Sequence, residues 1–219
     1  MIDLKLELPI QTAFIHVRDV QVTKDRQAFS ALQDCGRLYL EKYRNANISE
    51  IPGVQVARQL FRMLGIEPTK HRPSSEAMLR RILKELPLSP INNLVDVSNW
   101  CALDFLLPNG VYDFHKIVGD ITLRKGGPDE SYWGISNREI HLEDRFTLVD
   151  AAGPFGSPMT DSQRSAVDPG TLEAIAIMYA TPQYDRQLFL SQAETYATRI
   201  VRICGGTIAA VRIIDHPDR

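Results

Sequence analysis

The amino-acid sequence predicts an α+β fold, in which helices pack against mixed or antiparallel sheets within one domain that spans residues 1–219. Two observations support this prediction. Residues 20–107 carry apolar side chains at helical spacing in several segments. Residues 108–182 instead form short runs rich in β-branched and aromatic residues, separated by Gly, Pro, Asp and Asn, and further strands are expected within 1–20 and 207–215.

The length and composition indicate a globular protein. A chain of 219 residues can bury a core without disulfide bonds, and 44% apolar with 24% charged residues is ordinary for this class. Three cysteines, Cys35, Cys101 and Cys204, lie far apart, so we expect reduced thiols in the core. Charged residues interrupt the N-terminal stretch MIDLKLELPI, and no later apolar run is long enough to span a membrane. These features predict a cytoplasmic protein without membrane contacts.

The first half of the chain begins with two expected strands, IDLKLEL and TAFIHVRDV, separated by a proline. Helices are expected over 25–43 and 54–64, and the second should end at the glycine that follows it. A third helix contains EAMLRRILKEL, with Ser74 or Ser75 as its N-terminal cap. Its buried face follows the i, i+3, i+4, i+7 pattern and comprises Leu79, Ile82, Leu83 and Leu86.

A fourth helix, over 92–106, carries polar side chains in a stretch otherwise suited to a hydrophobic core. Asn92, Asp96 and Asn99 stand at i, i+4 and i+7 and therefore share one face. Buried amides and carboxylates are unfavourable unless they are hydrogen-bonded, so this stripe must face partners. Two interpretations remain open: the polar residues hold nearby loops in place, or they meet a ligand.

The second half should be mostly sheet. Strands are expected at GVYDF, DITLRKG, ESYWGI, REIHL, TLVDAAG and EAIAIMYA. A helix over 186–203, closed by Gly205 and Gly206, leads to a last strand, AAVRIID. The segment GPFGSPMTDSQRS is expected to be a loop, and loops of this composition often carry function. Its Arg164 could bind a carboxylate or phosphate, and a solvated loop is the alternative.

Charge is distributed unevenly along the chain. The formal net charge of −2 excludes a broadly basic nucleic-acid-binding protein, and no DNA partner is expected. Residues 58–84, however, contain seven basic and two acidic residues, a formal charge of +5. One face of the molecule could therefore meet a polyanion, although a solvated helix face is the alternative. Arg80, Arg81 and Lys84 are expected to point outward from the third helix.

Three stretches together resemble the B3/B4 domain of the phenylalanyl-tRNA synthetase beta subunit, and especially its free-standing members: HRPSSEAMLRRILK, SPINNLVDVSNWCALDFLLPNGVYDFHKI and GDITLRKG. The matching positions are Asn93, Asp96, Asn99, Pro108 and the Tyr112-Asp113 pair. The resemblance covers most of the chain and is strongest over 72–126. It implies the α+β fold of that domain for the whole chain.

In the synthetase this domain is an editing site that hydrolyses tyrosine wrongly esterified to the phenylalanine tRNA. An apolar pocket shaped for Phe cannot strongly reject an isostere that adds a hydroxyl, so a second site must remove the error. This chain departs from the family pattern at two positions: Gly110 replaces a His, and Met178 or a near neighbour aligns with a Glu. His115 could fill a similar space to the missing His, although a histidine in a turn is usually only solvated. No base is therefore transferable from the family.

The resemblance implies a free-standing, trans-acting deacylase that cleaves the ester of a mischarged aminoacyl-tRNA. The implied partners are the tRNA acceptor end and an aminoacyl moiety. The chain has no ATP-binding motif and no room for an aminoacylation domain, so a complete ligase is not expected. The candidate residues are Asp96 and Asp113 for catalysis, Asn93, Asn99, Gly110, Tyr112 and Arg164 for substrate binding, and Arg72, Arg80, Arg81 and Lys84 for RNA binding.

The histidines are scattered singly without zinc-ligand spacing, so no metal and no cofactor are expected. A second hypothesis also remains: a non-catalytic module that binds an amino acid, a small metabolite or a protein and has lost the editing residues.

Overall fold

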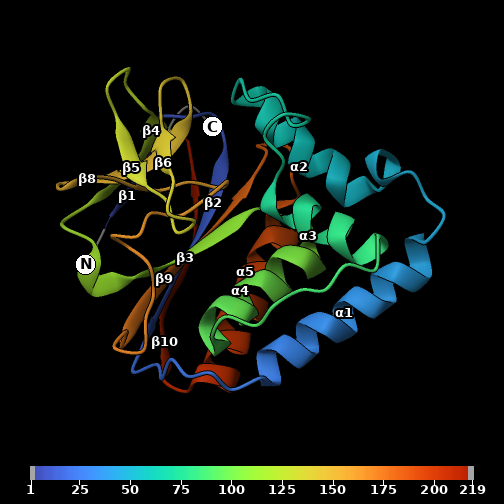
Figure 1. Ribbon diagram of the computed structural model, residues 1–219. Helices are drawn as coiled ribbons and strands as arrows, with labels where there is room; N and C mark the ends of the chain where they lie inside the picture. The colour runs from blue at the N-terminus through green and yellow to red at the C-terminus, as the bar shows by residue number, and fades with distance from the viewer. Residues whose placement is uncertain (1–2, 217–219) are drawn as a thin grey trace.

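A computed structural model describes residues 3–216 of the chain (Figure 1). Its elements are β1 (Leu4–Leu6), β2 (Gln11–Arg18), α1 (Gln27–Tyr43), η1 (Ile48–Glu50), α2 (Pro52–Met63), α3 (Ser74–Leu83), α4 (Asn93–Phe105), β3 (Asn109–Asp113), η2 (Phe114–Lys116), β4 (Ile121–Lys125), β5 (Ser131–Trp133), β6 (Glu139–His141), β7 (Phe146–Asp150), β8 (Gly153–Gly156), β9 (Glu173–Ala180), α5 (Arg186–Cys204) and β10 (Thr207–Asp215). The predicted α+β class is confirmed.

Two four-stranded sheets and a hairpin organise the strands. The sheet β10-β2-β9-β3 is antiparallel throughout. The sheet β1-β4-β7-β8 is mixed, because β1 pairs in parallel with β4. β5 and β6 form a separate two-stranded hairpin. The expected strands at both chain ends therefore join sheets built from the second half.

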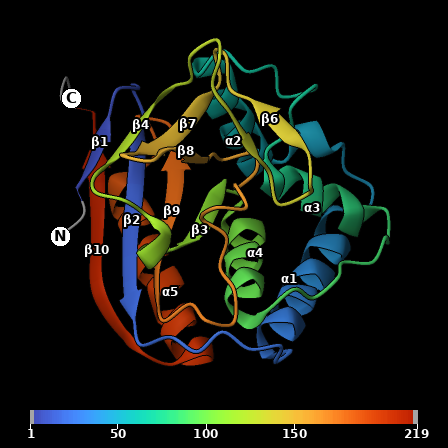
Figure 2. The ribbon, with the colours of Figure 1, turned by 60° about the vertical axis from the view of Figure 1, so that its left-hand side comes forward.

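The central antiparallel sheet is covered on both faces, which explains the long apolar runs in its inner strands. Ile15 and Val17 of β2 pack with α4 and α5 in one core cluster. Phe14, on the opposite face, belongs to a second cluster with residues of the mixed sheet such as Leu123 and Leu148. Helices α1 and α3 pack against α4, and α2 lies beside α3, as Figures 1 and 2 show.

Local signals account for several helix ends. The side chain of Asp185 accepts a hydrogen bond from Leu188 N and caps α5. Gly205 and Gly206 follow this helix with φ of 74° and 85°, in the region that glycine tolerates best. A Cβ at Gly206 would overlap the carbonyl oxygen of Arg18. The glycine pair therefore ends the helix as predicted. The three cysteines are free and buried, as expected.

Three local predictions were wrong. No side chain caps α3, whose N-cap residue is Pro73, because the chain enters the helix one residue earlier than the serines would require. Leu86 lies beyond the end of α3 and is exposed. The start of the supposed loop GPFGSPMTDSQRS forms strand β8, which pairs with β7. Within residues 3–216, no helix is both long and apolar enough to cross a membrane.

Candidate functional site

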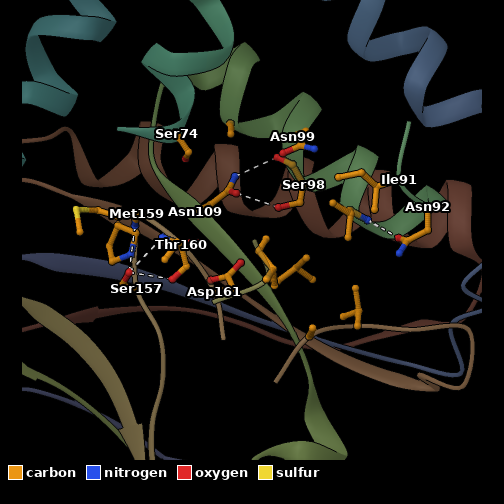
Figure 3. A pocket seen from close by; sticks show the side chains of 17 residues that line it. Ser74, Ile91, Asn92, Ser98, Asn99, Asn109, Ser157, Met159, Thr160 and Asp161 are labelled. Carbon is orange, nitrogen blue, oxygen red and sulfur yellow. Dashed lines mark hydrogen bonds between the residues drawn. The ribbon is translucent and has the colours of Figure 1, made fainter. Parts of the chain in front are cut away.

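A pocket of about 280 Å³ lies between α4, the start of β3 and the segment after β8 (Figure 3). Its polar lining comes from Asn92, Ser98, Asn99, Asn109, Ser157, Thr160, Asp161 and Ser74, the first residue of α3. Its apolar lining includes Val95, Ala102, Val111, Met159 and Val167. Mostly apolar walls with a few convergent polar groups are typical of small-molecule sites.

Most of the polar residues at the start of α4 hold the surrounding chain in place. Asn92 Oδ1 accepts from Val95 N at 2.9 Å and caps the helix. Asn93 Oδ1 accepts from Thr23 N, and its Nδ2 donates to the carbonyl of Gln21, each at 2.9 Å. Both Oδ atoms of Asp96 face Ile91 N, at 3.1 and 3.3 Å. Burial raises the pKa of Asp96, and this backbone hydrogen bond opposes the rise.

Asn99 differs from these neighbours because its side chain makes no hydrogen bond to any described residue. It lines the pocket together with Asn92, as Figure 3 shows. Of the predicted binding pair, Asn99 therefore has polar atoms available to a ligand, whereas those of Asn93 are used within the chain.

Two hydrogen bonds join Asn109, the first residue of β3, to Ser98 of α4. Ser98 Oγ donates to Asn109 Oδ1 at 2.9 Å, and Asn109 Nδ2 donates to the carbonyl of Ser98 at 3.3 Å. This pair lies on the wall of the pocket (Figure 3). The two elements that form the pocket are thus held at a fixed separation.

The opposite wall is a turn after β8. Ser157 Oγ donates to the carbonyl of Thr160 at 3.0 Å and accepts from Thr160 N at 3.2 Å. Tyr132 of β5 also donates to that carbonyl, at 2.7 Å. Ile135 N donates to the carbonyl of Asp161 at 3.0 Å. The hairpin β5–β6 therefore pins the turn and fixes the backbone that carries Asp161.

Asp161 is the ionisable residue among those that line the pocket, and it was not among the residues predicted to form the site. Its Oδ1 is buried and has no hydrogen-bond partner among the described residues. Burial raises the pKa of Asp161 to about 7, and the neighbouring Tyr112 hydroxyl opposes the rise. Gly110 makes room for this arrangement, because a Cβ there would lie 3.0 Å from Asp161 Oδ1. A carboxyl group with such a pKa can take up and release a proton near neutral pH.

Tyr112 and Gly110, both predicted to bind substrate, lie behind Asp161 and do not line the pocket. The hydroxyls of Tyr112 and Tyr179 are buried and unpaired within the described chain. Burial, followed by the nearby Asp161, raises the pKa of Tyr112 well above its usual value, so the phenol stays neutral. Gly110 matters here through its missing side chain, since a Cβ would overlap the Tyr112 hydroxyl.

Asp113 and Arg164 are both engaged by partners within the chain and lie outside the pocket lining. Asp113 Oδ1 accepts from His115 N at 2.9 Å, and its Oδ2 accepts from Thr171 Oγ1 at 2.7 Å. Arg164 forms a fork on Asp150 at 2.9 and 3.0 Å. Asp150 therefore occupies the guanidinium fork of Arg164, and the predicted role of Arg164 in substrate binding stays a prediction. The side chain of His115 is mostly exposed and lies beside Glu173, not beside Asp161.

The basic surface is partly neutralised. Glu76 is fully buried and receives Arg58 at 2.7 Å and Arg80 at 2.8 Å. Burial acts to raise the pKa of Glu76, but the hydrogen bonds from the two arginines outweigh it and the pKa lies below its usual value. Arg81 is exposed and bonds the carbonyl of Pro87. Arg72 is exposed and stands two residues before Ser74, which lines the pocket.

Comparisons with known proteins agree on one family. The model of the B3/4 domain matches residues 56–212. The phenylalanine–tRNA ligase beta subunit of Brucella abortus (strain 2308) is 29% identical over 117 residues, which cover 52% of this chain and 14% of that protein. The beta subunit of Rhodopseudomonas palustris is 22% identical over 264 residues, covering 99% of this chain and 33% of that protein.

Among solved structures, an N-terminal fragment of the phenylalanyl-tRNA synthetase beta subunit from Pyrococcus horikoshii aligns with a TM-score of 0.49 and 12% identity, covering 100% of this chain and 53% of the fragment. The chain spans a third or less of the length of the curated relatives given above. No group of three or more His, Cys, Asp or Glu side chains that could hold a metal is found among residues 3–216.

Proposed function

The chain belongs to the B3/4 domain family, and we propose that it hydrolyses the ester of a mischarged aminoacyl-tRNA supplied in solution. The observation that carries this proposal is Asp161, a carboxyl group with a pKa of about 7 at the wall of the pocket. Asp161 supplies a base within the chain, although Gly110 stands where the family pattern has a His, and Met178 or a near neighbour where it has a Glu.

In the proposed reaction, Asp161 accepts a proton from a water molecule, which attacks the ester carbonyl. The C–O bond to the ribose breaks, and the ribose oxygen takes the proton back from Asp161. The amide of Asn99 and the hydroxyl of Thr160 line the same pocket and can donate to the carbonyl oxygen as it becomes negative. Asp96 acts here as a positioning residue, since it holds the backbone of Ile91 at the pocket rim.

The pocket would receive the side chain of the amino acid. Its volume of about 280 Å³ is small and suits one amino-acid side chain rather than a larger ligand. Val95, Ala102 and Val111 favour an uncharged, largely apolar group there. The ester itself would then lie near Asp161, where the polar atoms gather.

The tRNA would approach over the segment that leads into α3. Lys70, His71 and Arg72 are exposed and are separated from the pocket residue Ser74 only by Pro73. Cations at this position can contact the phosphates of an acceptor end whose terminal ribose lies at the pocket. Arg81 lies further along α3 and Lys84 directly follows its end, so both would contact the RNA strand farther from its terminus.

A non-catalytic binding module is the second candidate, and the two departures from the family pattern favour it. Met178 is fully buried among apolar residues and can take no part in acid–base chemistry. In this alternative, Asp161 would instead accept a hydrogen bond from the ammonium group of a free amino acid.

Ester loss from a panel of tRNAs, charged with cognate and noncognate amino acids, distinguishes the two candidates. The purified protein should deacylate a subset of the noncognate pairs faster than buffer does. Asp161→Asn should abolish most of this activity, whereas Asp129→Asn, on an exposed loop, should not. Deacylation that equals the buffer rate across the panel, with amino-acid binding retained, would support the binding module and refute the hydrolase.

A further inference from the structure

A second cavity, separate from the pocket beside α4, lies across strands β2 and β10 on the other face of the central sheet. It has a volume of about 510 Å³ and is lined by Phe14, His16, Arg18, Phe114, Ala209, Ala210 and Arg212. None of these residues lines the pocket that holds Asp161. Strands β10 and β2 lie at the opposite edge of the sheet from β3, as Figure 2 shows.

The shape of this cavity follows from the pairing of the two strands. Phe14, His16 and Arg18 alternate along β2 and so point to the same face. Arg212 pairs with Phe14, and Ala210 pairs with His16. Because the side chain of Ala210 is small, a hollow remains between the two arginines. Arg212 pairs with Phe14, so the two arginines are about 13 Å apart along the direction of the strands. A register shift between Ile208 and Ala210 adds a bulge at the cavity wall.

The charges of the lining favour an anion. It contains two arginines, and none of the described residues that line it is acidic. Burial lowers the pKa of the third polar residue, His16, so its ring contributes hydrogen bonding rather than charge at neutral pH. Glu173 lies beside the cavity, where its Oε2 contacts His16 Nε2 at 3.0 Å and Arg18 Nε at 3.4 Å. Glu173 stands opposite Arg18 on β9, on the same face of the sheet, and offsets part of the positive charge of that arginine. Arginine guanidinium groups match the oxygens of phosphate in a forked geometry.

The remaining lining consists of two phenylalanines, Phe14 and Phe114, and two alanines. The rings of His16 and Phe114 stack with centroids 4.5 Å apart and an interplanar angle of 11°. The guanidinium group of Arg212 lies 4.9 Å from the centre of the Phe14 ring. Flat aromatic surfaces and guanidinium planes are the groups on which nucleobases stack. The volume falls within the range of natural small-molecule sites.

From these contacts we propose that the cavity across β2 and β10 binds a phosphate-bearing nucleotide, with its phosphate at an arginine and its base on the aromatic wall. The nucleotide is either free or a unit of an RNA strand, because both sources present the same phosphate and base. This site goes beyond the proposed ester hydrolysis, since it shares no residue with the pocket of Asp161.

Calorimetric titration of the purified chain with adenosine monophosphate, adenosine and inorganic phosphate tests this site. The monophosphate should bind with Kd between about 10 µM and 1 mM, and more tightly than either fragment. The double variant Arg18→Gln, Arg212→Gln should weaken binding about 10- to 100-fold. Arg37→Gln, an exposed arginine on α1, should leave it unchanged. Absence of binding by the monophosphate to folded protein would refute the site.

Ala210→Leu provides a test that removes no charge. The larger side chain should fill the hollow and abolish nucleotide binding while thermal unfolding and deacylation stay as in the wild type. Nucleotide binding that survives both this variant and the double arginine variant would also refute the site. Uncharged tRNA distinguishes the two sources: a weaker affinity in the same variants indicates an RNA strand, and an unchanged affinity indicates a free nucleotide.

Discussion

The Tyr112 hydroxyl and Asp161 Oδ1 both face the space that a side chain at residue 110 would occupy. A Cβ at Gly110 would overlap the hydroxyl and lie 3.0 Å from the carboxylate oxygen. Neither oxygen has a hydrogen-bond partner within the described chain. The glycine therefore lets a buried phenol and a carboxylate with a raised pKa approach each other behind the pocket. We therefore expect both the deacylation rate and the stability of the protein to depend on Asp161 and Gly110.

Deacylation should depend on pH through Asp161. The base must be ionised to accept a proton, and burial raises its pKa to about 7. The rate above the buffer control should therefore rise with pH, reach half of its maximum near pH 7 and then level off. Single-turnover deacylation between pH 5.5 and 8.5, about 1.5 units on either side of that pKa, measures this profile.

In Asp161→Asn, the inflection near pH 7 should disappear and the remaining rate should be lower by about 10²- to 10⁴-fold. An unchanged inflection in this variant would assign the titration to another group. Asp129→Asn should retain both the rate and the profile, because Asp129 is exposed and is not among the residues that line the pocket.

The stability of the protein should show the opposite pH dependence. The pKa of Asp161 rises from 3.8 to about 7 on folding, so between these values the folded state holds a proton that the unfolded state releases. The contribution of this group to the free energy of unfolding therefore falls as pH rises from about 4 to 7. Asp161→Asn should gain stability relative to the wild type between pH 5 and pH 8, by up to a few kcal/mol.

Denaturant unfolding of both proteins at the two pH values measures this difference. The other ionisable groups are common to both proteins, so their contributions cancel in the comparison. Equal pH dependence in the two proteins would show that Asp161 keeps an ordinary pKa.

Substitution of Gly110 by Ala should destabilise the fold. The new methyl group would overlap the Tyr112 hydroxyl, which is buried and cannot move without displacing its neighbours. The expected cost is about 2–3 kcal/mol in the free energy of unfolding. Gly127→Ala is the matched control, because the nearest atom to its Cβ would be at an ordinary 3.7 Å. Thermal or denaturant unfolding should separate the two variants, and equal stabilities would contradict the crowding at Gly110.

The fold was more accessible from the sequence than the site. Helical spacing predicted α4 and its polar stripe, because that signal is local. The role of each residue in the stripe was not local: Asn93 bonds a segment about 70 positions earlier, at Thr23 and Gln21. The position of Asp161 is set by strand β8 and by the hydrogen bond from Ile135 N of the hairpin, and its pKa is affected by Tyr112 of another strand. No periodicity within GPFGSPMTDSQRS reports these contacts.

Asn93 and Asn99, both predicted to bind substrate, should respond differently to substitution by Ala. Asn93→Ala removes a buried amide that accepts a hydrogen bond from Thr23 N and donates one to the carbonyl of Gln21. The free energy of unfolding should therefore fall by about 2–3 kcal/mol. Asn99→Ala should change stability by less than about 0.5 kcal/mol and should instead raise KM or lower kcat for deacylation. Unfolding and steady-state kinetics measured on both variants test the division, which fails if Asn99→Ala is the less stable protein.

Binding of tRNA should depend more on Arg72 than on Arg80. Arg72 is exposed beside the pocket residue Ser74, whereas Arg80 is held at 2.8 Å by the buried Glu76. Arg72→Gln should therefore weaken binding and reduce the slope of log K against log salt by about 1, as expected for the loss of one phosphate contact. Arg80→Gln should leave the slope unchanged, because a guanidinium group engaged by an internal carboxylate releases few counterions from RNA. Filter binding at several salt concentrations measures both slopes. Equal losses in the two variants would place the strand along the whole of α3, and no loss in either would move the RNA away from this surface.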